Sequence, residues 1–309
     1  MQLNPLVKKD IKVQSRSMRM SWGLFAYEAI MAVVFFIAMV MIKQQSRWSY
    51  ENIYSSIVML YPVLAITQFL IIGMVVPVRT ASAISGEKER QTFDIMMTTG
   101  MTEFSIVFGK VLTSIIQSMF YVAAAMPVLA MAFVIGGLSM AYLFWFLAIA
   151  VLASIFSASI GIYCSSICKK SVSAVIMSYI FYLGFFILTM APVWLMASTV
   201  TNMTQGVLNA SLMFCLINPA VYLLEFFGWI MGGESYIFEM MTWNAKGALS
   251  ETTVHYLWMA GSSAMLILVS FLFLWLAARR ITPVSKKVAK KLAAKNNMPY
   301  MNTRENGNG

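Results

Sequence analysis

The sequence predicts an all-α, polytopic membrane protein with six transmembrane helices. Hydrophobic residues make up 60% of the 309 residues and charged residues only 11%, whereas a soluble domain carries about 25% charge. Six apolar segments reach the roughly 20 residues that a helix needs to cross a hydrocarbon core of about 30 Å. The expected spans are 22–41, 53–78, 106–135, 142–164, 172–196 and 255–278.

The first 20 residues form a basic arm. Leu3, Leu6, Val7 and Ile11 are spaced among lysines and arginines, and Pro5 suits the first turn of a helix. This pattern predicts an amphipathic helix that lies on the inner face of the membrane. The apolar run that follows the arm is too long for the core of a cleavable signal peptide.

The distribution of basic residues predicts the orientation. With the N-terminus inside, the inner segments hold 19 of the 22 Lys and Arg residues, and the outer loops hold only Lys43, Arg47 and Lys246. Loops rich in Lys and Arg stay on the cytoplasmic side of a membrane. Both termini are therefore expected in the cytoplasm. Nucleic-acid binding is disfavoured, because the bases do not alternate with aromatic residues on one face.

A polar segment, residues 79–110, separates the second span from the third. Ser85 can cap a helix that begins at Gly86. Glu87 and Glu89 in its first turn would favour the positive end of the helix dipole. Gly100 is a natural stop for this helix. The segment therefore predicts a short cytosolic helix between two spans.

This short helix has an apolar stripe and an acidic face. Phe93, Met96 and Met97 fall at positions i, i+3 and i+4, which places them on one side. The carboxylates, Asp94 among them, would be repelled by anionic lipid. We therefore expect the helix to dock a cytosolic protein rather than rest on the membrane.

The outer loop, residues 197–254, contains an apolar stretch over 206–232 that is split by Asn218-Pro219. A residue before proline is pushed out of helical geometry. The first piece, 206–217, would be only about 18 Å long as a helix. A seventh span would also place the basic tail outside, against the charge rule. We therefore expect a pair of short re-entrant helices before the last span.

These features divide the chain into three parts. Residues 1–20 are the cytosolic arm, residues 21–280 are the membrane domain, and residues 281–309 are a basic cytosolic tail. The tail is rich in Asn and Gly beyond its bases, and we expect a short helix followed by disorder.

Glu28 is the one acid inside a predicted span. An acid within a membrane is a functional candidate by default. The alternative is a carboxylate near the inner interface that pairs with a base of the arm or of the 79–110 segment. Glu28 lies only about 9 Å beyond Trp22 along a helix, which favours the second interpretation.

The sequence gives no sign of an enzyme. One histidine, His255, and three cysteines, Cys164, Cys168 and Cys215, do not supply a metal site, because His255 is expected on the opposite side of the membrane from Cys164 and Cys168. An intramembrane metalloprotease would need several His and acidic ligands in its spans. No catalytic, cofactor-binding or metal-binding residue is predicted.

Two stretches of the chain form a recognisable pattern. They are Gly86-Glu87-Lys88-Glu89-Arg90-Gln91-Thr92 with the apolar run from Phe93 to Met97, Thr98-Thr99 and Ile106 through Gly109-Lys110, and Asn4-Pro5-Leu6-Val7-Lys8-Lys9 in the arm. The pattern resembles that of ABC-2-type ABC transporter permeases, which are exporter-like membrane components with six spans. Gln91 stands where that family often has Gly, and we expect it not to upset the helix.

The resemblance implies a permease subunit that pairs with a second permease chain and with cytosolic ABC ATPase subunits. The chain lacks the G-x-x-x-x-G-K-[ST] pattern that cradles phosphates, so ATP and Mg²⁺ are expected in the partner only. The short helix would then be the coupling helix. Its implied docking residues are Glu87, Lys88, Glu89, Arg90, Phe93, Asp94 and Met97.

The implied substrate is an apolar or amphipathic compound that is exported across the cell membrane. The alternative is a secondary transporter or channel without an ATPase. That class predicts charges near the middle of the membrane or an inverted repeat, and the sequence shows neither.

Overall fold

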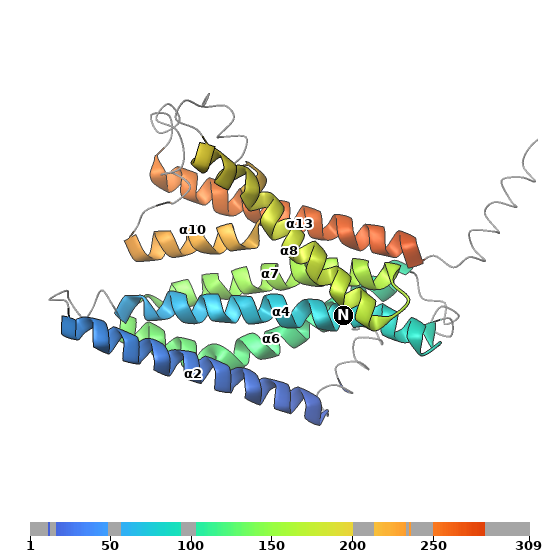
Figure 1. The fold of residues 1–309 in the computed structure, drawn as a ribbon, viewed down its shortest axis with the longest axis horizontal. Helices are drawn as coiled ribbons and strands as arrows, with labels where there is room; N and C mark the ends of the chain where they lie inside the picture. The colour runs from blue at the N-terminus through green and yellow to red at the C-terminus, as the bar shows by residue number, and fades with distance from the viewer. Residues whose placement is uncertain are drawn as a thin grey trace, which may run out of the picture.

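The protein is a bundle of long, apolar helices (Figure 1). The computed structural model describes residue 12 and residues 17–48, 57–93, 103–199, 213–232, 235 and 250–281, which contain no β-strand. Six of the helices are long and apolar enough to cross a membrane, which confirms the predicted number of spans. The helices are α2 (Met18–Trp48), α4 (Leu60–Glu89), α6 (Glu103–Gly136), α7 (Met140–Ile167), α8 (Ser171–Thr199), α10 (Pro219–Gly232) and α13 (Glu251–Ile281).

Five of the six spans lie where the sequence places them, with helices that extend a few residues further at each end. The second span differs, because α4 begins at Leu60 and continues without a break to Glu89. Its 30 residues make a helix about 45 Å long, longer than the hydrocarbon core of about 30 Å. α4 is therefore long enough for its polar last turns, from Arg79 to Glu89, to extend beyond an apolar layer of that thickness.

Helices α4 and α7 form the centre of the bundle, and α4 packs more extensively against α7 than against any other element described. They run in the same direction, because Thr80 lies against Gly161 and Ser85 lies against Ser165. Small residues recur along α7 every three or four positions and let two backbones approach closely. The buried small residues of this face are Ala150, Ser154, Ala158, Gly161 and Ser165.

Gly161 marks the closest approach of the two helices. A Cβ atom added to Gly161 would lie 1.9 Å from the Thr80 Oγ1 atom and 2.9 Å from its Cβ atom. Thr80 is itself fully buried, and its hydroxyl donates a hydrogen bond to the Val76 carbonyl oxygen at 2.9 Å. Only glycine fits here without moving α4 away from α7.

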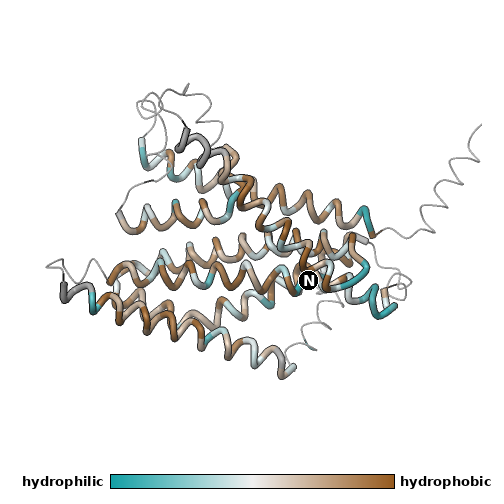
Figure 2. The backbone as a smooth tube through the Cα atoms, in the orientation of Figure 1, coloured by the Kyte–Doolittle hydropathy of each residue, from teal (hydrophilic) through white to brown (hydrophobic). Residues whose placement is uncertain are grey.

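The outer helices of the bundle expose apolar side chains along their length. Phe36 on α2 and Leu188 on α8, for example, are exposed, as expected for helices that face lipid or another apolar chain. Figure 2 shows hydrophobic residues along the helices and hydrophilic residues gathered at their ends.

One end of the bundle carries most of the described basic residues, and we call it the basic end. Helices α2, α6 and α8 begin there, and α4, α7 and α13 end there (Figure 1). Among its bases are Lys88, Lys110, Lys170 and Arg280. The predicted arm, apart from residues 12 and 17–20, and the basic tail beyond Ile281 lie outside the described residues.

The opposite end contains α10, the second of the two predicted short helices. Asn218 stops the preceding turn and caps α10, since its side-chain oxygen accepts a hydrogen bond from the Ala220 amide at 2.9 Å. With 14 residues, α10 is about 21 Å long, too short to cross the membrane. The predicted break at Asn218-Pro219 is therefore confirmed. Most of the first short helix, residues 206–217, lies outside the described residues, so the re-entrant pair stays a prediction.

Candidate coupling site at the basic end of the bundle

The predicted start of a separate helix at Gly86 is wrong. Ser85 lies inside α4, is fully buried, and donates its hydroxyl to the Ala81 carbonyl oxygen at 2.7 Å. A second partner comes from α7, where the Ser165 Oγ atom accepts hydrogen bonds from the amides of Ile84 and Ser85 at 2.9 and 2.8 Å. The helix continues because its polar groups find partners in neighbouring helices and need no water.

The actual end of α4 is a tight turn at Arg90, Gln91 and Thr92. The Gln91 amide donates to the Lys88 carbonyl oxygen at 3.2 Å and the Thr92 amide donates to the Glu87 carbonyl oxygen at 3.0 Å. This pair of bonds closes a helix end in which one residue is left-handed. That residue is Gln91, with φ of 59°. Gln91 therefore lies just beyond α4, at a position that favours glycine, and the expectation that it does not upset a helix stays a prediction.

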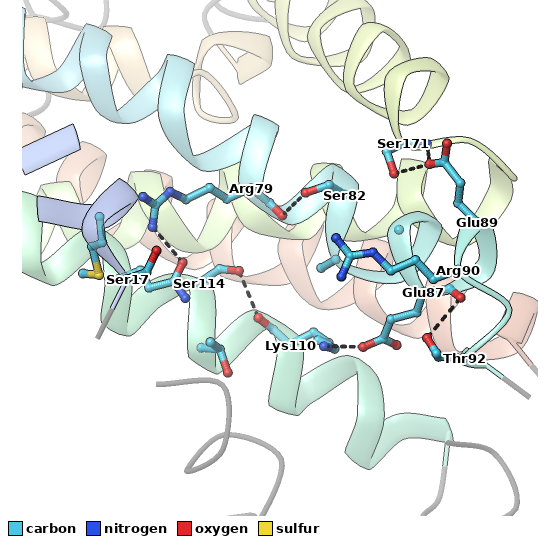
Figure 3. A pocket seen from close by; sticks show the side chains of 15 residues that line it. Ser17, Arg79, Ser82, Glu87, Glu89, Arg90, Thr92, Lys110, Ser114 and Ser171 are labelled. Carbon is cyan, nitrogen blue, oxygen red and sulfur yellow. Dashed lines mark hydrogen bonds and ion pairs between the residues drawn. The ribbon is translucent and has the colours of Figure 1, made fainter. Parts of the chain in front are cut away.

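Glu87 joins the end of α4 to α6. Its Oε1 atom lies 2.7 Å from the Lys110 Nζ atom, and the side chains of Glu87 and Lys110 are 25% and 10% exposed. An ion pair with this little water around it is screened less than one on the surface. Figure 3 shows this pair beside a cavity.

Lys88 joins the end of α4 to α7. Its Nζ atom donates hydrogen bonds to the carbonyl oxygens of Ser165 and Ser166 in the last turn of α7. A cation is favourable at this negative end of a helix dipole. The same Nζ atom lies 5.8 Å from the centre of the Phe93 ring.

Glu89 joins the end of α4 to α8. Its Oε2 atom accepts hydrogen bonds from the Ser171 hydroxyl at 2.8 Å and from the Ser171 amide at 3.2 Å. Ser171 is the first residue of α8, so the carboxylate caps that helix. Glu89 is the last residue of α4 and is exposed. The hydrogen bonds from Ser171 lower the pKa of its carboxyl below the ordinary value.

Three of the predicted docking residues therefore bind within the chain, each to a different helix. Arg90 is exposed in the turn that follows α4, and Phe93 is half-buried. Asp94 and Met97, with the rest of the predicted apolar stripe, lie outside the described residues. The arrangement makes the end of α4 a single point of attachment to α6, α7 and α8. A force applied to that turn would be transmitted to all three helices.

A cavity of about 870 Å³ opens beside this attachment, between α4, α6 and the beginnings of α2 and α8 (Figure 3). Its lining is mostly polar and includes Ser17, Arg79, Ser82, Thr113, Ser114 and Gln117. The sequence places Arg79 at the start of the polar segment, just after the second predicted span. In the structure it lies within α4, ten residues before the helix ends.

Glu28 lies on α2 and is half-buried. Its Oε1 atom is buried and has no hydrogen-bond partner among the described residues. Most side chains of the basic residues in the arm lie outside the described residues, so the pairing of Glu28 with a base of the arm or of the 79–110 segment stays a prediction.

A second buried polar cluster, at the opposite end, was missed in the sequence. The Glu225 Oε1 atom on α10 lies 3.0 Å from the His255 Nδ1 atom on α13 and accepts a hydrogen bond from the Ser235 hydroxyl at 2.6 Å. Glu225 is fully buried, and Trp229 stacks on the His255 ring. The available signal was a single acid in an apolar helix. The cluster fastens α10 to α13.

Within the described residues, no three His, Cys, Asp or Glu side chains come close enough to hold a metal ion. Cys164 and Cys215 are buried and Cys168 is half-buried.

A family model described as ABC-2 family transporter protein matches residues 14–279. No curated protein matches the chain.

Proposed function

Because the chain belongs to the ABC-2 family of transporter proteins, we propose that it is a permease subunit driven by a separate ABC ATPase. Membership in the family establishes a multi-pass membrane protein with a transport function. The ATPase partner, a second permease chain, and the export of an apolar or amphipathic compound are the further parts of the proposal. The basic end of the bundle would face the cytoplasm, where the ATPase has access to ATP.

One observation supports the ATPase partner most directly, namely the threefold attachment of the end of α4. Glu87, Lys88 and Glu89 hold α6, α7 and α8 respectively. A transporter powered from outside the membrane needs a contact point that moves several spans together. The turn at Arg90 lies next to these three bonds and is exposed, so a partner docked there would move the attached helices.

The internal bonds decide how the docking should be tested. Reversing Glu87, Glu89 and Arg90 together is expected to detach or uncouple the ATPase. That triple variant also breaks the bonds to α6 and α8. A sharper variant is Arg90→Glu. The Arg90 side chain is exposed, so this substitution reverses one surface charge.

The experiment is purification from membranes in mild detergent, followed by measurement of the ATPase that copurifies and of its hydrolysis rate. We expect the Arg90→Glu variant to retain less ATPase than the unaltered protein. Arg280→Glu is the matched control, since Arg280 is an exposed base at the same end, on α13. Both variants should still insert and elute as folded protein.

Normal amounts of active ATPase with the Arg90→Glu variant would contradict the docking at this turn. An unaltered protein that carries no ATPase under these conditions would contradict the whole proposal. It would then favour the alternative, a secondary transporter or channel.

A further inference from the structure

The cavity at the basic end contains a charge, on Arg79, that no carboxylate of the described residues balances. We propose that this cavity binds the anionic headgroup of an amphiphile, of the phosphate type, with Arg79 as the main charge partner. The proposal goes beyond the ATPase-driven transport function and does not depend on an ATPase.

The partners of Arg79 in the described part of the chain are neutral. Its Nη1 atom donates to the Gln117 Oε1 atom at 3.0 Å, and its Nη2 atom donates to the Tyr121 hydroxyl at 2.7 Å. The guanidinium also lies 5.2 Å from the centre of the Tyr121 ring. No carboxylate of the described residues lies within ion-pair distance of Arg79, whereas Lys110 in the same cavity is paired with Glu87. A partly buried charge without a counter-charge is costly, so an anion is the expected complement.

The chemistry of the guanidinium indicates the kind of anion. Arginine has five N–H donors in a planar fork, and the bonds to Gln117 and Tyr121 account for two of them. A planar fork suits phosphate and carboxylate oxygens, which accept two parallel hydrogen bonds. The partners Gln117 and Tyr121 are both buried and hold the fork in place. Figure 3 shows Arg79 among the residues that line the cavity.

The depth of Arg79 favours a headgroup. The apolar part of α4 ends at Val78, and Glu89 at the end of the helix lies about 15 Å further along. The stretch from Leu60 to Val78 is about as long as the hydrocarbon core is thick, so we place Arg79 near the edge of that core, just inside the lipid headgroups. The cavity brings that level into contact with the interior of the bundle.

Apolar side chains continue α4 on the side of Arg79 that faces the hydrocarbon layer, among them Val75 and Val76. The space between these side chains and Tyr121 of α6 is only about 10 Å³, too small for an alkyl chain. The chain of an amphiphile would therefore stay in the lipid while its headgroup binds Arg79.

A plain alternative is that Arg79 only anchors α4 at the membrane interface, as basic side chains near span ends do. An anchor would interact with any headgroup and would not distinguish an anionic lipid from a zwitterionic one of the same chain length. This difference makes the proposal testable.

The test measures binding to the purified protein in an uncharged detergent. The probes are dihexanoyl phosphatidylglycerol, dihexanoyl phosphatidylcholine and inorganic phosphate. We expect the anionic lipid to bind at least tenfold more tightly than the zwitterionic lipid. Arg79→Gln should lose that preference, Arg79→Lys should keep part of it, and the exposed control Arg280→Gln should keep all of it.

Competition with inorganic phosphate identifies the source of the ligand. If phosphate displaces the lipid, the site recognises a free phosphate group; if it does not, the site needs the lipid chains as well. Either result supports an anion site at Arg79. Equal affinity for the two lipids in the unaltered protein would overturn the proposal, and so would unchanged preference in a folded Arg79→Gln variant. The result is independent of ATPase copurification, so failure of one proposal can be told from failure of the other.

Discussion

At the scale of single residues, the structure gives a backbone conformation to Gln91, the position where the sequence departs from the family pattern. Gln91 has φ of 59°, a conformation that costs a residue with a side chain about 1–2 kcal/mol relative to glycine. The amides of Gln91 and Thr92 close the end of α4 only in this conformation. This conformation is a physical reason for the glycine that the family often has at this position.

We therefore predict that Gln91→Gly stabilises the protein. The expected gain is about 1 kcal/mol in the free energy of unfolding, because glycine adopts positive φ without a steric cost. Thermal unfolding in detergent would measure it. Arg90→Gly is the control, since Arg90 has φ of −84° and glycine there should bring no gain. A lower melting temperature for Gln91→Gly would contradict the assigned turn.

Gly161 leads to the opposite prediction. A Cβ atom at this position would lie 1.9 Å from the Thr80 Oγ1 atom, so Gly161→Ala must push α4 away from α7. We expect a loss of about 1–3 kcal/mol, the usual cost of overpacking. Gly184→Ala is the matched control on α8, where an added Cβ atom meets nothing within 4 Å. Equal melting temperatures for the two variants would show that the close approach is absent.

At the scale of elements, the limits of the helices were predictable where composition decides them. The apolar runs placed five spans correctly, and the Asn218-Pro219 break placed the start of α10. The extent of α4 was not predictable in the same way. Its polar end is stabilised by Ser165 and Ser171, which lie about 80 positions later in the chain. A local pattern of caps and charges cannot contain that information.

The candidate site, like the helices, was only partly predictable from the sequence. The segment was found from its charges and its resemblance to a family, and the docking role of Glu87, Lys88 and Glu89 stays a prediction. Their roles within the chain came only from the structure, as did Arg79 in the cavity wall and the buried Glu225–His255 pair.

The link between α4 and α6 can be measured as a coupling energy. We predict that Glu87→Gln and Lys110→Gln are not additive, with a coupling on the order of 1 kcal/mol. The reason is the 2.7 Å ion pair, whose side chains are mostly buried. The measurement is a double-mutant cycle on thermal or denaturant unfolding. Glu87→Gln combined with Arg280→Gln is the control cycle and should be additive. A coupling near zero for the first cycle would remove the proposed link to α6.

At the scale of the whole molecule, two features lie at opposite ends of the same bundle. The basic end has the attachment of α4 and the polar cavity, and the opposite end has α10 fastened to α13 by Glu225 and His255. Helices α7 and α13 contact each other extensively and reach from one end to the other. A movement imposed on the basic end therefore has a continuous packed route to the far end.

The orientation of the bundle is the prediction on which this scheme depends. We expect the basic end to face the cytoplasm, because Lys- and Arg-rich segments are retained on that side.

Single cysteines placed at Arg280 and Thr252, exposed residues at the two ends of α13, would report the two sides. They should be introduced after Cys168, the half-buried native thiol, has been changed to serine. A membrane-impermeant maleimide applied to intact cells should label Thr252→Cys at once and Arg280→Cys only after permeabilisation. The parent chain without either new cysteine gives the background from the buried Cys164 and Cys215. Labelling of Arg280→Cys in intact cells would reverse the orientation, and an ATPase in the cytoplasm could then not reach the end of α4.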